Sequence, residues 1–312
     1  MWLKSSSGYP AKRSGEGFIL VSVMLLVTLF LTASLGYAWF ARSQLKRLGA
    51  EQFSARAKGI SYAAILEVAR GLQFDDNDYD SMQEPWFGLH LIPVPDLGIL
   101  TVQISPLDDR FPINSLFLPD GATLRGEISY SWEKIWDLYG EERLGTLILD
   151  FIDRDSTPRL GSDERSGFLN RDLTDLSELT LIDQFPADLL VRGPGRPALQ
   201  DFFTVWCGGK ININVAPVQV LNMIDGIDET VASDIMALRE TKALTGFDDI
   251  SSGIPSFPSD ILPRVVNLVG FESIYFKVTV EASSLQGDYK ALYRAFLKKE
   301  GSGYRIIKWE EY

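Results

Sequence analysis

The chain has 312 residues, enough for one large domain or two ordinary ones, and its hydrophobic content of 46% and aromatic content of 12% are typical of a globular protein. Its formal net charge of −12 opposes non-specific binding to nucleic acids and to anionic lipid headgroups. Cys207 is the single cysteine and His90 the single histidine, which excludes an intramolecular disulfide, a thiolate metal cluster, a histidine-based zinc site and most Ser-His-Asp catalytic schemes.

The first predicted element is a long N-terminal helix. Residues 18–40 contain no charged side chain, and at ~1.5 Å per residue this segment can cross the ~30 Å hydrocarbon core of a bilayer as a helix. A secretory signal peptide has a shorter apolar part, of ~7–15 residues, and ends in a small-residue cleavage site. Apolar residues recur at helical spacing as far as Val68. We therefore expect one helix over 18–72, with 18–40 in the membrane.

An acidic, turn-rich segment follows this helix. Its cluster of acidic and amide side chains over 75–80 has no acid at the twelfth place from Asp76, where Phe87 stands, so we expect this cluster to be solvated rather than metal-bound. The next segment, WFGLHLIPVP, is interpreted as a loop that packs on aromatic residues, and it gives His90 a structural role.

Two stretches of alternating polar and apolar residues predict strands on either side of a helical middle. Leu100, Val102 and Ile104 alternate with polar residues, as in a half-buried strand. From residue 274 the alternation returns, and the glycines in LQGDY and EGSGY predict the turns of a three-stranded antiparallel meander.

The middle of the chain shows short apolar stripes at helical spacing, separated by Gly, Pro and Asp. They are the segments SYSWEKIWDLYG, ERLGTLILDFID, DLTDLSELTLI, ADLLVRG and PALQDFFTVW. We therefore predict an α+β chain in which a large all-helical domain, 119–264, is inserted into an α/β domain formed by 73–118 and 265–312.

Residues 211–240 look like a helix-hairpin-helix unit within this insertion. Asp225-Gly226 ends a first apolar helix, and Asp228 is a natural N-cap for a second one. In many proteins such a unit binds a DNA phosphate through backbone N–H groups at the hairpin. Here Asp225, Asp228 and Glu229 crowd the hairpin and repel a phosphate, so we interpret the unit as architectural.

The start of the chain resembles a type IV prepilin signal: a short basic leader over 1–17, ending in Gly17, and Phe18 at the opening of the apolar segment. In that family a prepilin peptidase removes the leader and methylates the new N-terminus. The resemblance implies cleavage after Gly17, with Phe18 as the first mature residue. Ser22 then occupies the fifth mature position, where pilin-like subunits usually carry a glutamate, and its hydroxyl can hydrogen-bond a carbonyl one turn back.

Six segments in order resemble the K-type minor pseudopilins of the bacterial type II (general) secretion pathway. They are the prepilin-like start, RFPINSLF, LILDFIDRDSTPRLGSDE, DLSELTLI, LQDFFTVWCGGKININVAPVQVL and YRIIKWEEY. Two places depart from the family pattern, because Arg165 and Ser166 stand where aromatic residues are common and Ile213 stands where leucine is usual. Neither departure affects the main inference.

The resemblance implies a type IV pilin-like fold with a long N-terminal helix, an antiparallel sheet and a large inserted α-domain. It implies a subunit that joins I- and J-type minor pseudopilins at the tip of the periplasmic pseudopilus, where the group supports initiation of assembly and protein export across the outer membrane. It further implies a single-pass protein of the bacterial inner membrane, with a cytoplasmic N-terminus and a periplasmic soluble domain. The positive-inside rule alone leaves this orientation open, because basic residues flank both ends of the apolar segment.

Members of this family are associated with bound calcium, which directs attention to one acidic loop. Asp153, Asp155, Thr157 and Glu164 occupy positions 1, 3, 5 and 12 of an EF-hand-like spacing. A proline stands at the sixth place, where an EF-hand needs glycine, so the loop is not an EF-hand. Hard oxygen ligands at this spacing suit Ca²⁺, and the alternative is a solvated acidic loop.

Catalysis and organic cofactors find no support in the sequence. Among 42 acidic residues some carboxylate pairs lie close by chance, and no phosphate-binding Gly-Lys-Ser/Thr loop is present. We therefore expect a structural assembly protein rather than an enzyme. The alternative is a membrane-anchored DNA-binding pseudopilin that uses the helix-hairpin-helix-like unit, which the acidic hairpin disfavours.

Overall fold

The computed structural model describes residues 15–162, 167–183, 185–193, 195–258 and 260–312, with side chains from Phe18 onward. It divides into two units, one that ends at Arg56 and one that runs from Ala57 to Tyr312. Each unit is described by itself.

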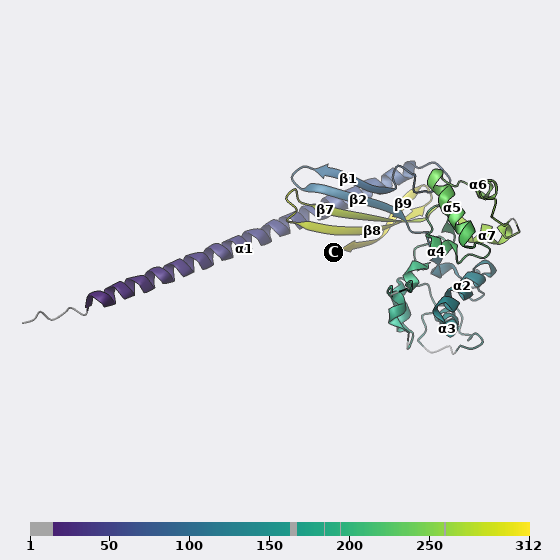
Figure 1. The fold of residues 1–312 in the computed structure, drawn as a ribbon, viewed down its shortest axis with the longest axis horizontal. Coiled ribbons are helices and arrows are strands. Elements are labelled where there is room, and N and C mark those ends of the chain that lie inside the picture. Colours follow the sequence, from purple (N-terminus) through teal and green to yellow (C-terminus); the bar gives the residue numbers. More distant parts are fainter. Residues whose placement is uncertain (1–14, 163–166, 184, 194, 259) are drawn as a thin grey trace, which may run out of the picture. The chain divides into compact units, whose positions relative to one another are not determined.

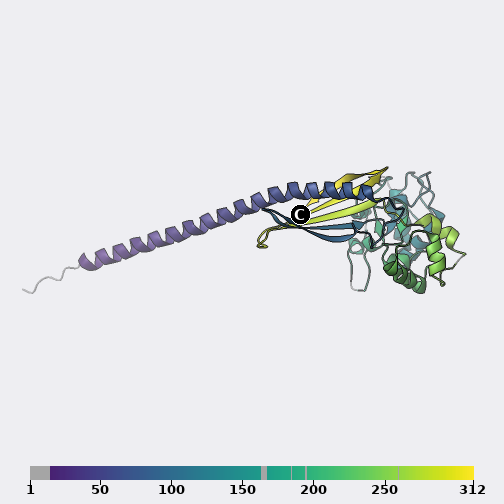
Figure 2. The same ribbon diagram turned by 90° about the horizontal axis from the view of Figure 1, so that it is seen from above.

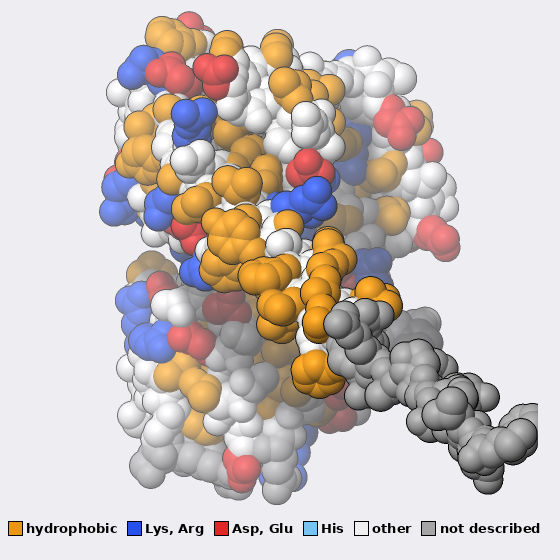
Figure 3. All heavy atoms as spheres, turned by 90° about the vertical axis from the view of Figure 1, so that its left-hand side faces the viewer, with side chains coloured by type: hydrophobic (Ala, Val, Ile, Leu, Met, Phe, Trp, Pro, Cys, Tyr) orange, Lys and Arg blue, Asp and Glu red, His pale blue; other side chains and the backbone are white. Residues whose placement is uncertain are grey.

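The described part of the first unit is the N-terminal portion of helix α1 (Gly15–Gly71). Among the described residues this is the one helix long and apolar enough to cross a membrane, with a mean hydropathy of 2.6 in its most apolar window and none of that window buried. Figure 3 shows hydrophobic side chains gathered on this helix in the foreground. The long helix and its apolar segment agree with the prediction from the sequence.

The second unit contains a five-stranded antiparallel sheet (Figure 1). Its strands, in spatial order, are β1 (Gly88–Val94), β2 (Gly98–Pro106), β7 (Tyr275–Ser283), β8 (Lys290–Glu300) and β9 (Gly303–Glu311). The predicted meander is confirmed, since β7, β8 and β9 follow one another in the chain and pair as neighbours. The predicted strand around Val102 is β2, whose residues alternate between buried and more exposed positions.

The last turns of α1 lie along this sheet (Figure 2). Ala57, Ile65 and Ala69 of the helix are buried, as are alternate residues of the central strands such as Val102 and Val278. Alternation puts every second side chain of a strand on one face, so one face of the sheet forms a core with the helix. Burial of these side chains against each other is the main source of stability in this part of the chain.

Strand β1 corrects the prediction of a loop around His90. His90 lies opposite Val102 of β2 in the antiparallel ladder, and its Nε2 lies 2.9 Å from the carbonyl oxygen of Trp86. The alternation that identifies a strand is absent here, because Leu89, Leu91 and Ile92 are all apolar and all exposed. An edge strand with both faces apolar lacks the pattern of a half-buried one.

A helical body, defined here as residues 111–269, is inserted between β2 and β7. These two strands are neighbours in the sheet, so the chain leaves the sheet and returns to the adjacent position. The body contains helices α2 (Gly126–Tyr139), α3 (Glu142–Ile152), α4 (Val218–Leu221), α5 (Glu229–Thr241), α6 (Phe247–Gly253) and α7 (Leu262–Leu268). Figure 1 shows these helices gathered at one end of the sheet.

Short elements complete the chain. Two parallel strand pairs tie distant segments of the body together: β3 (Phe111–Pro112) with β4 (Phe203–Thr204), and β5 (Ile211–Asn212) with β6 (Val269–Gly270). The 3-10 helices are Leu72–Phe74, Ile113–Ser115, Leu176–Leu181, Ala187–Leu190 and Leu199–Asp201. Three of the predicted helical segments are therefore 3-10 turns, since Asp and Pro at their borders leave too few residues for an α-helix.

The helical body has its own hydrophobic core, formed by buried side chains between Phe111 and Val269. Trp136 of α2 and Phe151 of α3 are among its largest fully buried side chains. Gly145 lets the two helices approach, because a Cβ at this position would lie 2.5 Å from the ring of Trp136. The body is thus held by packing of its own residues, separately from the core under the sheet.

Candidate functional site

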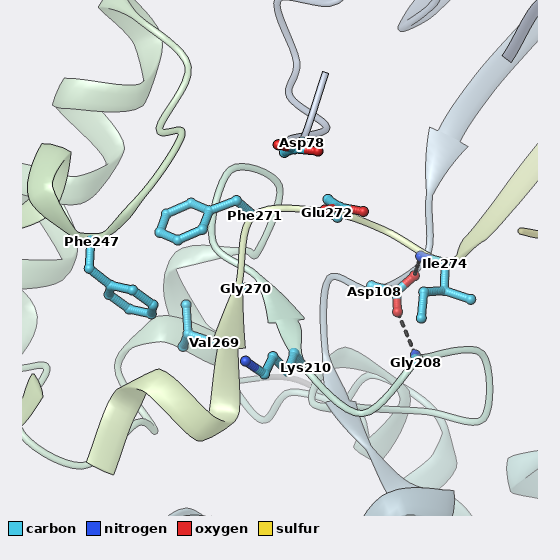
Figure 4. A pocket seen from close by; sticks show the side chains of 10 residues that line it. All are labelled: Asp78, Asp108, Gly208, Lys210, Phe247, Val269, Gly270, Phe271, Glu272 and Ile274. Atoms are coloured by element: carbon cyan, nitrogen blue, oxygen red, sulfur yellow. Dashed lines mark hydrogen bonds between the residues drawn. The ribbon is translucent and has the colours of Figure 1, made fainter. Parts of the chain in front are cut away.

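A buried carboxylate, Asp108, joins the helical body to the sheet. It stands two residues after β2, and its Oδ1 accepts a hydrogen bond from the backbone N–H of Gly208 at 2.5 Å (Figure 4). Its Oδ2 accepts from the backbone N–H groups of Ile274 and Tyr275, both at 2.8 Å. Burial raises the pKa of Asp108 to about 6, although the three N–H donors act in the opposite direction. The two points where the chain leaves and re-enters the sheet therefore share one carboxylate.

A second buried carboxylate, Asp80, supports the same junction. Its Oδ2 accepts a hydrogen bond from the backbone N–H of Ser273 at 2.6 Å, and the residue is only 5% exposed. Burial raises the pKa of Asp80 to about 7. The prediction that the acidic cluster after α1 is solvated is therefore wrong for Asp80. Asp75 is half-buried, and its Oδ2 accepts a hydrogen bond from Nε1 of Trp86 at 2.7 Å.

The segment KININVAP contributes two buried asparagines, of which Asn212 belongs to the junction and Asn214 to the interior of the helical body. Nδ2 of Asn212 donates to the carbonyl oxygen of Asp80 and to Oγ of Ser273, both at 2.9 Å. The side chain of Asn214 exchanges two hydrogen bonds with the backbone of Leu244, at 2.8 and 2.9 Å. Sequence reasoning missed these roles; the repeated Asn in an apolar segment is the signal that points to buried polar partners.

A pocket of 390 Å³ lies beside these groups (Figure 4). Its lining includes the aromatic pair Phe247 and Phe271, whose ring centroids are 5.0 Å apart, and the side chain of Lys210. Nζ of Lys210 donates to the carbonyl oxygen of Val266 at 3.0 Å, and Asp108 accepts the N–H groups described above. Lys210 and Asp108 are thus engaged with the chain's own backbone, while Asp78 and Glu272 also line the pocket.

The predicted calcium loop begins at the carboxyl end of α3. Asp153 is 1% exposed and accepts a hydrogen bond from the guanidinium of Arg159, which also donates to Asp150 at 2.6 Å. Oδ1 of Asp155 accepts from the backbone N–H of Thr157 at 2.7 Å. Glu164 lies outside the described residues. Sequence reasoning found Asp153 and missed Arg159, although Pro-Arg belongs to the family segment.

Burial raises the pKa of Asp153 to about 6, against the opposing effect of Arg159. Among the described residues no three His, Cys, Asp or Glu side chains converge in an arrangement that would hold a metal ion. Oδ1 of Asp153 is nevertheless buried and has no hydrogen-bond partner among the described residues. An orphaned carboxylate oxygen is a hard ligand of the kind that Ca²⁺ prefers, so the residues present fit a cation at Asp153.

The hairpin of the helix-hairpin-helix-like unit has a structural explanation. Asp228 caps α5 as predicted, because its Oδ1 accepts from the backbone N–H of Val231 at 2.9 Å. Gly226 has φ +77°, and a Cβ there would lie 2.3 Å from the side chain of Ile261, so the glycine is needed for close packing. Asp225 forms an ion pair with Arg264. The hairpin therefore faces another part of the helical body.

The predicted processing site, Gly17–Phe18, falls in the first turn of α1. Oγ of Ser22 donates a hydrogen bond to the carbonyl oxygen of Phe18 at 2.8 Å. This confirms the prediction that the Ser22 hydroxyl donates a hydrogen bond to a carbonyl oxygen one turn back in its own helix. Cleavage and methylation at this site stay predictions.

An apolar groove of 860 Å³ runs between the last turns of α1 and the edge of the sheet. Ile60, Ala64 and Val68 of the helix line it on one side, and the strands β1 and β2 line it on the other. Contiguous apolar surface of this kind marks interaction sites on soluble domains. Sequence reasoning missed the groove because it missed β1.

The structure is similar to a chain of the crystal structure of the GspK–GspI–GspJ complex from the enterotoxigenic Escherichia coli type 2 secretion system. The TM-score is 0.58 and the sequence identity 18%, over 87% of this chain and 99% of the other. No family model matches the sequence, and no curated protein matches it. At this identity the similarity shows the fold, and it confirms the predicted α+β class with a long N-terminal helix, an antiparallel sheet and additional helices.

Proposed function

We propose that this chain is a minor pseudopilin of a type II secretion system and acts as a structural assembly subunit rather than as an enzyme. The observation that carries the proposal is the fold similarity, which extends over almost the whole length of a chain from the GspK–GspI–GspJ complex. The prepilin-like start at Gly17–Phe18 and the segments of the K-type pattern support it independently, because they are features of sequence rather than of fold.

The partners that follow from this proposal are I- and J-type minor pseudopilins. The similar chain belongs to a complex with GspI and GspJ, and the apolar groove beside α1 offers surface suited to protein contact. Buried charges such as Asp80 and Asp108 are engaged with the chain's own backbone, so they are not available for partners or substrates.

The place of the subunit in the fibre is its tip. The helical body lies at the end of the sheet where β2 ends and β7 begins. The same end is tied to the segment after α1 through the hydrogen bond from Ser273 to Asp80. A body of this size at this end of the sheet would collide with a pilin-like subunit stacked beyond it. Only the first subunit of a fibre avoids that collision.

Membrane insertion and processing follow the prepilin pattern. The apolar part of α1 is the anchor in the bacterial inner membrane, with a cytoplasmic leader and a periplasmic soluble domain. Prepilin peptidase removes residues 1–17 and methylates Phe18. Calcium binds at the loop after α3 and stabilises it, with Asp153 and Asp155 among its ligands; the orphaned Oδ1 of Asp153 supports this part of the proposal.

The test is co-purification of the full chain with the I- and J-type pseudopilins of the same bacterium, coexpressed and extracted in detergent. A tagged copy of this chain should retain both partners through washing. A tagged single-pass protein with an unrelated periplasmic domain is the matched control and should retain neither. Failure of this chain to retain either partner, with all proteins present in the membrane fraction, would refute the proposed function.

A further inference from the structure

The carboxyl end of helix α3 brings together two buried carboxylates. Asp150 lies in the last turn of α3, and Asp153 caps this end of the helix. Asp150 is 0% exposed and Asp153 is 1% exposed. Burial disfavours charged groups, and the carboxyl end of a helix carries partial negative charge that repels anions. Two carboxylates at this place therefore require a cation.

Arg159 supplies that cation from the loop after α3. Its Nη1 donates to Oδ1 of Asp150 at 2.6 Å and also donates to Oδ2 of Asp153. Its backbone N–H donates to Oδ2 of Asp150 at 3.1 Å, so both oxygens of Asp150 are satisfied. Its Nη2 donates to the carbonyl oxygen of Ala122, and the guanidinium lies 5.3 Å from the ring centroid of Phe117. The guanidinium is therefore fixed on several sides.

This compensation is incomplete. Among the described residues one guanidinium faces two carboxylates, which leaves one negative charge over, and Asp155 adds to the negative potential at Asp153. Oδ1 of Asp153 is buried without a hydrogen-bond partner among the described residues. A buried acceptor without a donor is unfavourable. The site therefore favours a cation of higher charge than the one it holds.

We propose that Arg159 is a built-in counter-ion that competes with a divalent cation for Asp150 and Asp153. In the metal-free chain the guanidinium holds the two carboxylates and keeps the loop in place. A divalent cation that binds Asp153 displaces the guanidinium, and this displacement weakens the apparent affinity for the metal. The inference rests on the calcium site of the proposed function and adds the reason why the loop is held without the metal.

The test is a Ca²⁺ titration of the full chain in detergent, followed by calorimetry and by the melting temperature at each concentration. The variant Arg159→Gln removes the internal cation and keeps a polar side chain of similar length. Arg154→Gln is the matched control, because Arg154 is an exposed arginine nearby whose ion pair with Asp172 is long, at 3.8 Å. Arg159→Lys keeps the positive charge but lacks the planar guanidinium, and it replaces Arg159→Gln in the test if the glutamine variant does not fold.

We expect Arg159→Gln to melt below the wild type in chelator and to bind Ca²⁺ at least tenfold more tightly. Arg159→Lys should lie between the two, and Arg154→Gln should match the wild type. If the wild type binds Ca²⁺ and neither Arg159 variant binds it more tightly, the competition is refuted and the calcium site stands. If no variant binds Ca²⁺, both are refuted, whereas the pseudopilin role is judged separately by co-purification.

Discussion

Asn212 donates a hydrogen bond from Nδ2 to Oγ of Ser273 at 2.9 Å. Asn212 lies in β5 of the helical body, whereas Ser273 lies after the body, just before the chain re-enters the sheet at β7. The same Nδ2 donates to the carbonyl oxygen of Asp80, and Asp80 accepts the backbone N–H of Ser273. Three segments thus meet around one buried amide, and this cluster holds the body on the sheet.

Replacement of Asn212 by alanine should destabilise the protein strongly. The change leaves the Asp80 carbonyl and the Ser273 hydroxyl without their donor in a buried place, at a cost of roughly 2–4 kcal/mol in the free energy of unfolding. Denaturant unfolding of the full chain in detergent measures this loss. Asn267→Ala is the control, since Asn267 is exposed and its replacement should change the free energy of unfolding by less than about 0.5 kcal/mol. Equal losses in both variants would contradict the role given to Asn212.

The buried carboxylates predict a stability that falls as pH rises. The pKa of Asp80 is raised from its ordinary value of 3.8 to about 7, so the folded state binds this proton more tightly than the unfolded state does. The stabilising contribution of Asp80 is present in full below pH 3.8 and is lost as the pH rises through about 7. Asp108 and Asp153, each with a pKa raised to about 6, act in the same direction.

Asp80→Asn should therefore lose less stability between pH 4 and pH 8 than the wild type, by roughly 2–4 kcal/mol. Melting curves across this range measure the difference. Asp78→Asn is the matched control, because Asp78 is an exposed acid of the same cluster and its replacement should leave the slope unchanged. Parallel curves for Asp80→Asn and wild type would show that Asp80 does not titrate in this range.

Local rules predicted the regular elements well. Alternating residues predict one buried face in β2 and β7, and apolar stripes at helical spacing predict one in α2 and α3. The structure buries these faces. Strand β1 was not predicted from the sequence, because its exposed Leu89 and Leu91 give it no polar face. The pairing of β1 with β2 depends on tertiary structure, and the residues of β1 show no pattern that predicts it.

In the candidate sites, too, local interactions could be predicted from the sequence and long-range ones could not. The N-cap at Asp228 was predictable, because a cap acts on the backbone three residues away. The partners of Asp80 and Asp108 lie far along the chain, at Ser273 and Ile274, so no local spacing connects them. A single sequence shows which residues are polar within an apolar segment, and only the fold shows which distant backbone groups they satisfy.

The hairpin between α4 and α5 should not retain DNA. Asp225, Asp228 and Glu229 repel phosphate, and the only described cation paired there, Arg264, is engaged by Asp225. Filter binding of the full chain at about 50 mM salt should give no retention above background, although low salt favours any electrostatic contact. Retention that falls as salt rises would revive the DNA-binding alternative.

Calcium should raise the melting temperature of the full chain. A ligand that binds only the folded state stabilises it in proportion to the logarithm of its concentration. Removal of Ca²⁺ by a chelator should lower the melting temperature by about 2–5 °C, and Asp153→Ala should abolish the difference between the two conditions. Identical melting curves of the wild type with and without chelator would refute the calcium site.

Ser22→Glu should leave secretion largely intact if this subunit begins the fibre. The resemblance to pilin-like subunits implies that a glutamate at the fifth mature position is offset by the N-terminal amine of the preceding subunit, and a first subunit has no predecessor. Ser22 satisfies its hydroxyl on Phe18 of its own helix. The measurement is export of a secreted protein by a strain that lacks this gene and carries each variant. Ser22→Pro, which breaks the helix, is the control that should abolish export. Loss of export with Ser22→Glu as well, at normal protein levels, would count against the proposal that this chain is the first subunit of the fibre.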